Sequence, residues 1–324
     1  MTGQASSILV ITELAGGELT PLSLEMLGLA RELAGASGSV GAVILADNSP
    51  DVSKPLIARG ADKVYFDKTA QYEPDVWVSA LANIIRDGAF GIVLLGHTNL
   101  GADLAPRLAF RLSGGVATNC EAAKIEAGEV LATRVSYGGK ARSVVKLRGT
   151  PAILTMRTNA HEPREPDEGR TGEVLPVNCE AEVARIRLLG RSEENVSGPR
   201  LETAKIVIGG GRGLGGPEGF QILEAIAQKL GGVVGASRVA CDLGWCSPLM
   251  QIGLTGKTIA PDLYIAVGIS GASQHMAGCA GAKTIVAINT DPDAPIFEDA
   301  SIGIVGDYKE LLPKIADEVS RLNF

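Results

Sequence analysis

Residues 205–230 read KIVIGGGRGLGGPEGFQILEAIAQKL, and they predict a strand, a glycine-rich turn and a helix in direct succession. The β-branched run that opens the segment is typical of a buried strand, and Pro217 stands where the first turn of a helix tolerates proline. Between them, Gly211, Gly213 and Gly216 have the G-x-G-x-x-G spacing that lets a backbone approach a pyrophosphate at a helix N-terminus. The segment therefore predicts a nucleotide site in a parallel α/β fold.

The glycine turn alone leaves the kind of nucleotide open. An NAD enzyme would place Asp or Glu about 20 residues further on to hold the ribose, whereas this chain has Ser237 and Arg238 there. An arginine can accept the extra phosphate of NADP, so an NADP-dependent oxidoreductase is one alternative. Another alternative is a turn whose glycines serve only the close packing of the helix on the strand.

A second segment indicates that ligand contacts come from more than one strand. Residues 262–278 read DLYIAVGISGASQHMAG, and residues 283–289 read KTIVAIN. The first predicts a strand that runs into Gly268, followed by Ser270 and Gly271 at the start of a short helix. Ligands of open α/β sheets bind at the C-terminal edge of the strands, so we expect both turns to face one crevice.

The rest of the chain predicts two domains. Strand and helix patterns alternate over residues 8–112, which is typical of a parallel sheet covered by helices. Residues 115–147 form short β-branched runs separated by glycines, which predicts antiparallel hairpins. The polar segment GRSEENVSGPR at 190–200 is typical of a linker.

We therefore expect an α/β protein with two domains. The N-terminal domain, over 1–190, should be a parallel-sheet, nucleotide-binding-like domain with added antiparallel hairpins. A linker over 191–204 should lead to a doubly wound, Rossmann-like domain over 205–324.

Composition excludes several classes of partner. The net charge is −7, and Lys and Arg are scattered rather than clustered, which argues against nucleic acid. No apolar run approaches the roughly 20 residues that cross a bilayer, and the N-terminus lacks the features of a secretory signal. We expect no membrane insertion and a cytoplasmic or equivalent soluble compartment. The 5 cysteines contain no CxxC pair, so we expect reduced thiols and no metal site.

The second half of the chain resembles the alpha subunit of electron-transfer flavoproteins. The resemblance rests on the Leu-Tyr-Ile-Ala strand, Gly-Ile-Ser-Gly, Gln-His and Val-Ala-Ile-Asn between Leu263 and Asn289. It extends through GASR at 235–238 and TGK at 255–257, and it is looser in the first half, at LGHT (95–98) and GADLAPR (101–107).

The resemblance implies a non-covalent FAD in the second domain and no catalytic residue. The positions that match the family's cofactor contacts are Arg212, Gly213, Ser237, Arg238, Ile252, Gly253, Leu254, Thr255, Ser270, Gly271, Ala272, Ser273, Gln274, His275, Asn289, Asp307 and Tyr308. The resemblance places Thr255 beside flavin N5 and His275 near the pyrimidine carbonyl next to N1. A cationic or hydrogen-bond-donating His275, with Arg238, would stabilise the negative charge of the one-electron-reduced ring.

One position departs from the family pattern. Leu254 stands where the family commonly has glutamine before the Thr-Gly-Lys run. The missing amide removes one hydrogen-bonding group from the expected flavin site.

The function that the resemblance implies is an electron carrier without substrate turnover of its own. Its expected partner is a beta subunit, with which it forms a heterodimer. Electrons would arrive by transient docking from a flavin dehydrogenase of the acyl-CoA type found in fatty acid β-oxidation, and leave to a quinone-reductase-type acceptor. A second alternative within the same family is the alpha subunit of a complex that bifurcates electrons from NADH.

Overall fold

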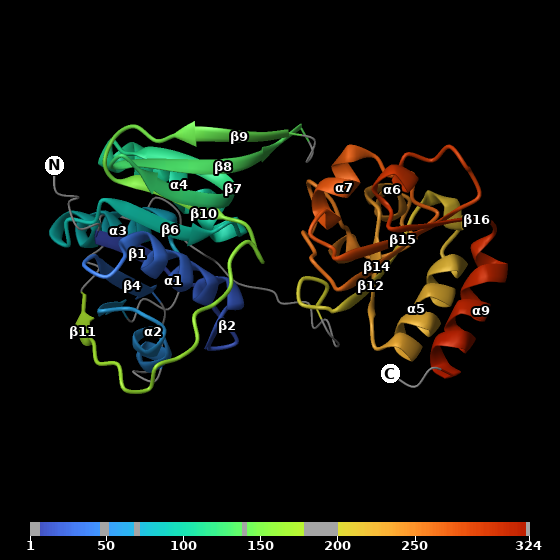
Figure 1. Ribbon diagram of the computed structural model, residues 1–324, viewed down its shortest axis with the longest axis horizontal. Coiled ribbons are helices and arrows are strands. Elements are labelled where there is room, and N and C mark those ends of the chain that lie inside the picture. The colour runs from blue at the N-terminus through green and yellow to red at the C-terminus, as the bar shows by residue number, and fades with distance from the viewer. Residues whose placement is uncertain (1–6, 46–51, 68–71, 138–140, 178–199, 322–324) are drawn as a thin grey trace. The chain divides into compact units, whose positions relative to one another are not determined.

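The computed structural model describes residues 7–45, 52–67, 72–137, 141–177 and 200–321, and it contains two separate sheets of mainly parallel strands (Figure 1). The chain divides into two compact units. Unit 1 comprises Met1–Val135 with Arg142–Glu193, and unit 2 comprises Ser136–Ala141 with Glu194–Phe324. The linker predicted over 191–204 lies mostly outside the described residues and stays a prediction.

Unit 1 is built on a nine-stranded sheet in the order β11-β5-β4-β1-β6-β10-β7-β8-β9. Its strands are β1 (Ser7–Ile11), β4 (Ser39–Leu45), β5 (Lys63–Asp67), β6 (Ile92–Gly96), β7 (Gly115–Glu126), β8 (Glu129–Ser136), β9 (Ala141–Lys146), β10 (Ala152–Met156) and β11 (Glu173–Pro176). Its helices are α1 (Pro21–Ala34), α2 (Ser53–Ala58), α3 (Pro74–Asp87) and α4 (Asn99–Leu112), and β2 (Leu14–Ala15) pairs with β3 (Glu18–Leu19).

Alternation along the central strand explains why helices cover both faces of this sheet. Ile8 and Val10 of β1 are buried in one core cluster with α1 and α2, whereas Leu9 and Ile11 are buried in another with α3 and α4. Successive side chains of a strand point to opposite faces, so a strand between two helical layers is apolar throughout. This arrangement confirms the covered parallel sheet that the sequence predicts.

The predicted antiparallel addition is also present. Strand β7 pairs in parallel with β10 at its start and antiparallel with β8 along its second half. Its register with β10 shifts between Leu154 and Met156, and its register with β8 shifts between Cys120 and Ala122. The hairpin strands therefore extend the parallel sheet instead of forming a separate one.

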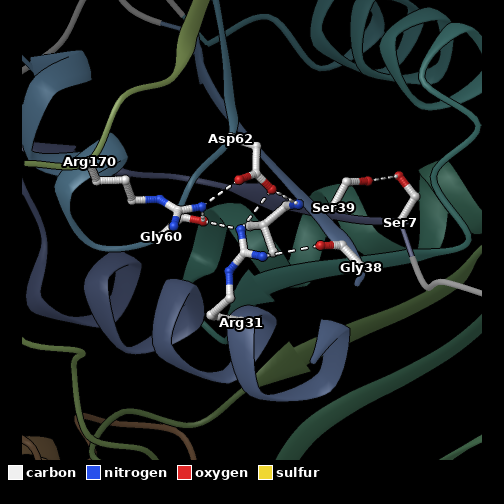
Figure 2. Close-up of polar contacts among 8 residues, drawn as sticks. Ser7, Arg31, Gly38, Ser39, Gly60, Asp62 and Arg170 are labelled. Atoms are coloured by element: carbon white, nitrogen blue, oxygen red, sulfur yellow. Dashed lines mark hydrogen bonds and ion pairs between the residues drawn. The ribbon is translucent and has the colours of Figure 1, made fainter. Parts of the chain in front are cut away.

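A half-buried charge cluster around Asp62 connects several elements of unit 1 (Figure 2). The Asp62 carboxylate accepts hydrogen bonds from the Val40 backbone at 2.9 Å and from Arg31 at 2.7 Å, and it also pairs with Arg170. Arg31 donates further to the carbonyls of Gly38 and Gly60. One carboxylate thus connects helix α1, strand β4 and the chain that leads into β11.

Unit 2 has a five-stranded parallel sheet in the order β13-β12-β14-β15-β16. Its strands are β12 (Ile206–Gly210), β13 (Val233–Ala236), β14 (Leu263–Val267), β15 (Thr284–Asn289) and β16 (Ile302–Val305). Its α-helices are α5 (Glu218–Leu230), α6 (Arg238–Asp242), α7 (Ser273–Cys279), α8 (Ile296–Asp299) and α9 (Tyr308–Arg321), with single 3-10 turns at Arg212–Leu214 and Pro248–Met250.

The two faces of this sheet have different helical covers. Helices α5, α6 and α9 pack on one face around Ile208 and Ile265, and α7 and α8 pack on the other around Val207 and Tyr264. In chain order the strands run 2-1-3-4-5, the doubly wound order whose switch point lies between the first and third strands. The predicted doubly wound fold is confirmed, and the switch point falls between β12 and β14.

Within the described ranges, no helix combines the length and apolar character that crossing a bilayer requires. The cysteines of those ranges, Cys120, Cys241, Cys246 and Cys279, are free thiols. Cys179 lies outside the described residues.

Candidate functional site

A pocket of about 720 Å³ lies in unit 2 at the switch point of its sheet. Gly213 lines it from the turn after β12, and Gly268 and Ser270 line it from the turn after β14. Strand ends on either side of a switch point diverge because their following helices cover opposite faces, which opens a crevice. The volume is within the range of pockets that hold small molecules and cofactors.

Most of the residues predicted to hold a cofactor line this pocket. They are Arg212, Gly213, Ser237, Arg238, Ile252, Gly253, Leu254, Thr255, Ser270, Ala272, Gln274, His275 and Asn289. The lining also contains seven residues that the sequence prediction left out, namely Val239, Gln251, Gly268, Ile269, Asp291, Ala294 and Pro295. Four predicted residues, Gly271, Ser273, Asp307 and Tyr308, do not line it.

Backbone contact between two glycines closes the bottom of the crevice. The Gly213 N–H donates a 2.9 Å hydrogen bond to the Gly268 carbonyl. Gly268 has φ of +61°, and a Cβ there would lie 2.8 Å from the backbone of Gly213. A Cβ on Gly213 would meet the Cα of Gly268 at 2.7 Å. Both glycines are therefore required for the two strand-end turns to touch.

Two arginines give the pocket a cationic side. Arg212 is exposed and forms no ion pair with any residue the structure describes, whereas Arg238 pairs with Asp242 at 3.3 Å on the solvent side of α6. Ser237 precedes Arg238, and its hydroxyl accepts a hydrogen bond from the Ala240 N–H as the N-cap of α6. Guanidinium groups with hydroxyls beside them are the donors that phosphate oxygens prefer.

The turn at 251–257 forms another wall, and helix α7 holds it in place. The Leu254 N–H donates to the Gln274 carbonyl at 2.7 Å, and the Gln251 side chain donates to the Thr255 hydroxyl oxygen at 3.0 Å. Because Gln251 occupies a lone pair of that oxygen, the Thr255 proton is free to donate elsewhere. Leu254 itself is 62% exposed at this wall.

Asn289 completes the edge at the end of β15. Its amide donates to the Ile269 carbonyl at 3.0 Å, and its side-chain oxygen accepts from the Asp291 N–H at 3.1 Å. The asparagine therefore links the loop after β14 to the loop after β15.

His275 is the buried polar side chain of the pocket. It is 7% exposed, its Nε2 atom lies 2.7 Å from the Tyr264 hydroxyl, and its Nδ1 atom is buried without a hydrogen-bond partner among the described residues. Burial lowers the pKa of His275 to about 4, and the backbone of Ile252 opposes only part of that shift. Of the two states expected from the sequence, cationic or hydrogen-bond-donating, this burial favours the neutral, hydrogen-bond-donating one near pH 7.

The predicted residues outside the pocket have structural contacts. Tyr308 is buried and donates from its hydroxyl to the Leu214 carbonyl at 2.9 Å, which supports the glycine turn from behind. Gly271 has φ of +85°, and a Cβ there would lie 2.3 Å from the Ile296 nitrogen. Asp307 caps the start of α9 through the Lys309 N–H.

Most of the seven lining residues that were missed follow a simple rule. Five of them, Gly268, Ile269, Asp291, Ala294 and Pro295, lie on the loops that follow β14 and β15, while Val239 lies in α6 and Gln251 follows the 3-10 turn at Pro248–Met250. Taking whole strand-end loops instead of single matching positions would have included those five. Chemically, the lining offers cations and hydroxyls for phosphates and a neutral imidazole for a polar ring edge.

Comparison with known proteins assigns a family to both units. Residues 8–181 match the family model described as electron transfer flavoprotein domain, and residues 200–280 match the electron transfer flavoprotein FAD-binding domain. An electron transfer flavoprotein subunit alpha of Thermoanaerobacterium thermosaccharolyticum is 40% identical over 323 residues, with 97% of this chain and 98% of the relative covered. The protein of that name in Bacillus subtilis is 38% identical, with 98% of each chain covered. Protein FixB of Rhizobium meliloti is 35% identical, with 96% of this chain and 92% of the relative covered.

Proposed function

The chain belongs to the electron transfer flavoprotein family as an alpha subunit, and on that premise we propose that it relays electrons between redox enzymes. FAD is its cofactor, and the matching FAD-binding domain begins at residue 200. The observation that carries the proposal is the pocket at the β12–β14 switch point, because it is the crevice that this fold uses for nucleotides and it lies in that domain.

The residues of the pocket fit FAD. The unpaired Nδ1 of His275 is a buried polar atom that needs a partner, and a flavin edge carries carbonyl oxygens and ring nitrogens. The exposed guanidinium of Arg212 and the hydroxyls of Ser237 and Ser270 suit a pyrophosphate. We therefore assign the phosphates to the Arg212 side of the pocket, and the ring to the side of Thr255 and His275.

When bound, FAD supplies one-electron and two-electron redox chemistry. Thr255 would donate its hydroxyl proton to the ring, because Gln251 already satisfies the hydroxyl oxygen. Arg238 would supply a positive charge, and His275 a neutral donor. The Gly213–Gly268 contact and the apolar side chain of Ile269 exclude water from the floor.

We propose that the subunit is an electron carrier without substrate turnover of its own. We propose a heterodimer with a beta subunit. Leu254 is 62% exposed and Val239 is 45% exposed at the pocket's edge, which suits a flavin site reached by other proteins. The proposed donors are flavin dehydrogenases of the acyl-CoA type, and the proposed acceptor is a quinone reductase.

Two alternatives remain testable. A bifurcating complex would hold a second FAD in the partner subunit and draw electrons from NADH. An NADP-dependent oxidoreductase would use Arg238 for the ribose phosphate instead of for the flavin ring.

The test is to purify the chain with the subunit that accompanies it, release the bound nucleotides by heat, and identify and count them. One FAD per heterodimer supports the relay, two FAD support bifurcation, and NADP without flavin overturns the proposal. Addition of an acyl-CoA dehydrogenase with its substrate should then bleach the flavin absorbance.

A substitution of Arg212 tests the assignment of the FAD phosphates to that side of the pocket. Arg212→Gln should weaken FAD binding by about tenfold or more, because a charge-assisted hydrogen bond is lost. Arg200→Gln is the matched control, since Arg200 is exposed and does not line the pocket. Equal affinities in the two variants would contradict the assignment.

A further inference from the structure

Tyr264 and His275 form a buried pair beneath the pocket. Tyr264 belongs to the central strand β14 and is 0% exposed, and His275 belongs to α7, which covers that face of the sheet. The Tyr264 hydroxyl oxygen lies 2.7 Å from His275 Nε2. Of the two rings, only His275 lines the pocket.

The glycine-rich segment makes room for this pair. Gly209 lies on β12, the strand next to β14, and pairs in register with Ala266. A Cβ at Gly209 would lie 2.1 Å from the Tyr264 hydroxyl oxygen, so any other residue would displace the phenol. Gly209 lies outside the G-x-G-x-x-G pattern at 211–216. The close approach of the Tyr264 phenol explains why this position is a glycine.

Each ring is neutral near pH 7, so the pair shares one imidazole proton and one phenol proton. Burial lowers the pKa of His275 to about 4 and raises the pKa of Tyr264 well above its ordinary value of 10.0. The hydrogen bond between them can therefore run in either of two directions, and each direction fixes a different histidine tautomer.

Counting partners decides between the two directions. Among the described residues, His275 Nε2 is the one hydrogen-bond partner of the Tyr264 hydroxyl. If Nε2 carried the proton, it would donate to the phenol oxygen, and the phenol proton would be left without an acceptor in a fully buried place. If Nδ1 carries the proton, the phenol donates to Nε2, so the phenol and Nε2 are both satisfied and the Nδ1–H is the one group left to find an acceptor. An unmade buried hydrogen bond disfavours the first arrangement by roughly tenfold or more.

We propose that Tyr264 is a positioning residue that fixes His275 as its Nδ1–H tautomer, so that an N–H donor stands unpaired at the pocket. The backbone of Ile252 lies near the ring and raises the pKa of His275, which agrees because it favours a proton on the imidazole, but its position lies outside ordinary hydrogen-bond geometry for Nδ1. The identity of the acceptor, a carbonyl oxygen or ring nitrogen of the flavin, rests on the proposed function. The tautomer itself does not.

The chain is suited to a direct measurement, because it has 3 histidines. We would label histidine nitrogens with ¹⁵N in the FAD-loaded heterodimer and record long-range proton–nitrogen correlations. A His275→Gln variant assigns the signals of His275 against those of His97 and His161. The expected result is a protonated Nδ1 and an unprotonated Nε2 that persist from pH 8 to pH 5.5. A protonated Nε2 in the unmodified protein overturns the proposal, whatever the variants do.

The Tyr264→Phe variant tests whether the Tyr264 hydroxyl fixes the His275 tautomer. Removal of the hydroxyl should move the His275 signals toward the Nε2–H tautomer or a mixture, and an unchanged Nδ1–H tautomer would overturn the role of Tyr264. Tyr308→Phe is the matched control, because it also removes one buried tyrosine hydroxyl from unit 2 but does not touch His275. Its His275 signals should match those of the unmodified protein.

Repeating the spectra after release of FAD separates the two proposals. If the Nδ1–H tautomer persists and its proton shift changes on FAD release, both are supported. If the tautomer persists and the shift is the same with and without FAD, Tyr264 fixes the tautomer but the ring placement beside His275 is wrong. A wrong tautomer in a protein that still binds one FAD overturns only the role of Tyr264.

Discussion

The Tyr308 hydroxyl donates a 2.9 Å hydrogen bond to the carbonyl of Leu214, 94 positions earlier in the chain. This contact holds the turn after β12 against the start of α9. It also assigns Tyr308, which matches a cofactor position by resemblance, to a supporting place outside the pocket.

Tyr308→Phe should therefore reduce stability without removing the cofactor. Loss of the hydroxyl leaves the buried Leu214 carbonyl unpaired, which lowers the unfolding free energy by about 1 to 2 kcal/mol. Chemical denaturation and FAD content measure the two effects. The control is Tyr137→Phe, whose side chain is 85% exposed. Loss of FAD at unchanged stability would contradict this assignment.

Gly268→Ala should damage both the fold of the pocket and FAD binding. The new methyl group would lie 2.8 Å from the Gly213 backbone at a residue with φ of +61°. Gly231→Ala is a control for backbone conformation alone, because Gly231 has φ of +66° and open space where the methyl would go. We expect about 1 kcal/mol of destabilisation from Gly231→Ala and a larger loss, with FAD affinity at least about tenfold lower, from Gly268→Ala. Similar losses in both variants would exclude the collision as the cause.

Glu25 should make unit 1 less stable as pH rises. Burial raises the pKa of this α1 carboxyl from 4.5 to about 7, although backbone N–H groups at Asn159, His161 and Ala160 oppose the shift. Between these values the unfolded chain releases the proton while the folded chain keeps it, so stability falls from about pH 4.5 to about pH 7. At pH 8 the free energy of unfolding of Glu25→Gln should exceed that of the unmodified protein by about 1 to 3 kcal/mol. At pH 4.5 the two proteins should differ little.

Denaturation at both pH values measures this effect as a difference between variant and parent. Glu18→Gln is the control, since Glu18 is an exposed glutamate of the same unit. If Glu25→Gln raised the free energy of unfolding equally at both pH values, protonation of the Glu25 carboxyl would not be the cause.

Asp62 should have the opposite pH dependence. Burial alone would raise its pKa, but the Val40 N–H and the guanidinium groups of Arg31 and Arg170 outweigh burial and hold the pKa below 3.8 (Figure 2). Its stabilisation is present above the unfolded pKa and disappears as pH falls through the lower folded pKa. Asp62→Asn should lower the free energy of unfolding by about 1 to 3 kcal/mol at pH 7, a range that allows for the partial exposure of Asp62. The loss should be smaller in acid.

The matched control for this prediction is Asp262→Asn. Asp262 also forms an ion pair, with Lys283 at 2.7 Å, but both side chains are largely exposed. We expect its denaturation midpoint to equal that of the parent. An equal effect of the two substitutions would show that the cluster around Asp62 does not act as a unit.

The sequence predicts most of the fold because buried strands and amphipathic helices have strong hydrophobic periodicity. It misses the edge strands β11 and β16, whose residues Glu173–Pro176 and Ile302–Val305 are mostly exposed. These strands are specified by backbone pairing with their neighbours, which leaves little hydrophobic signal in the side chains.

The site could be predicted to the level of strand-end positions and no further. Resemblance finds Thr255 and His275, but the hydrogen bond that orients Thr255 comes from Gln251, which has no distinctive pattern of its own. The space that Gly209 leaves for Tyr264 depends on the register of β12 and β14, which no local pattern encodes. The charge state of His275 depends on its burial, and a sequence does not state burial residue by residue.

The outer strands of the nine-stranded sheet bear on self-association. An edge strand offers unpaired backbone groups to any other strand, including one from a second copy of the chain. Strand β9 carries Arg142 and Lys146, paired with Glu121 and Glu129 at its side, so an added strand would have to displace or cover these charges. At the opposite edge β11 ends with Pro176, which has no N–H to donate. Both open ends of the sheet are thus poor templates for fibrils.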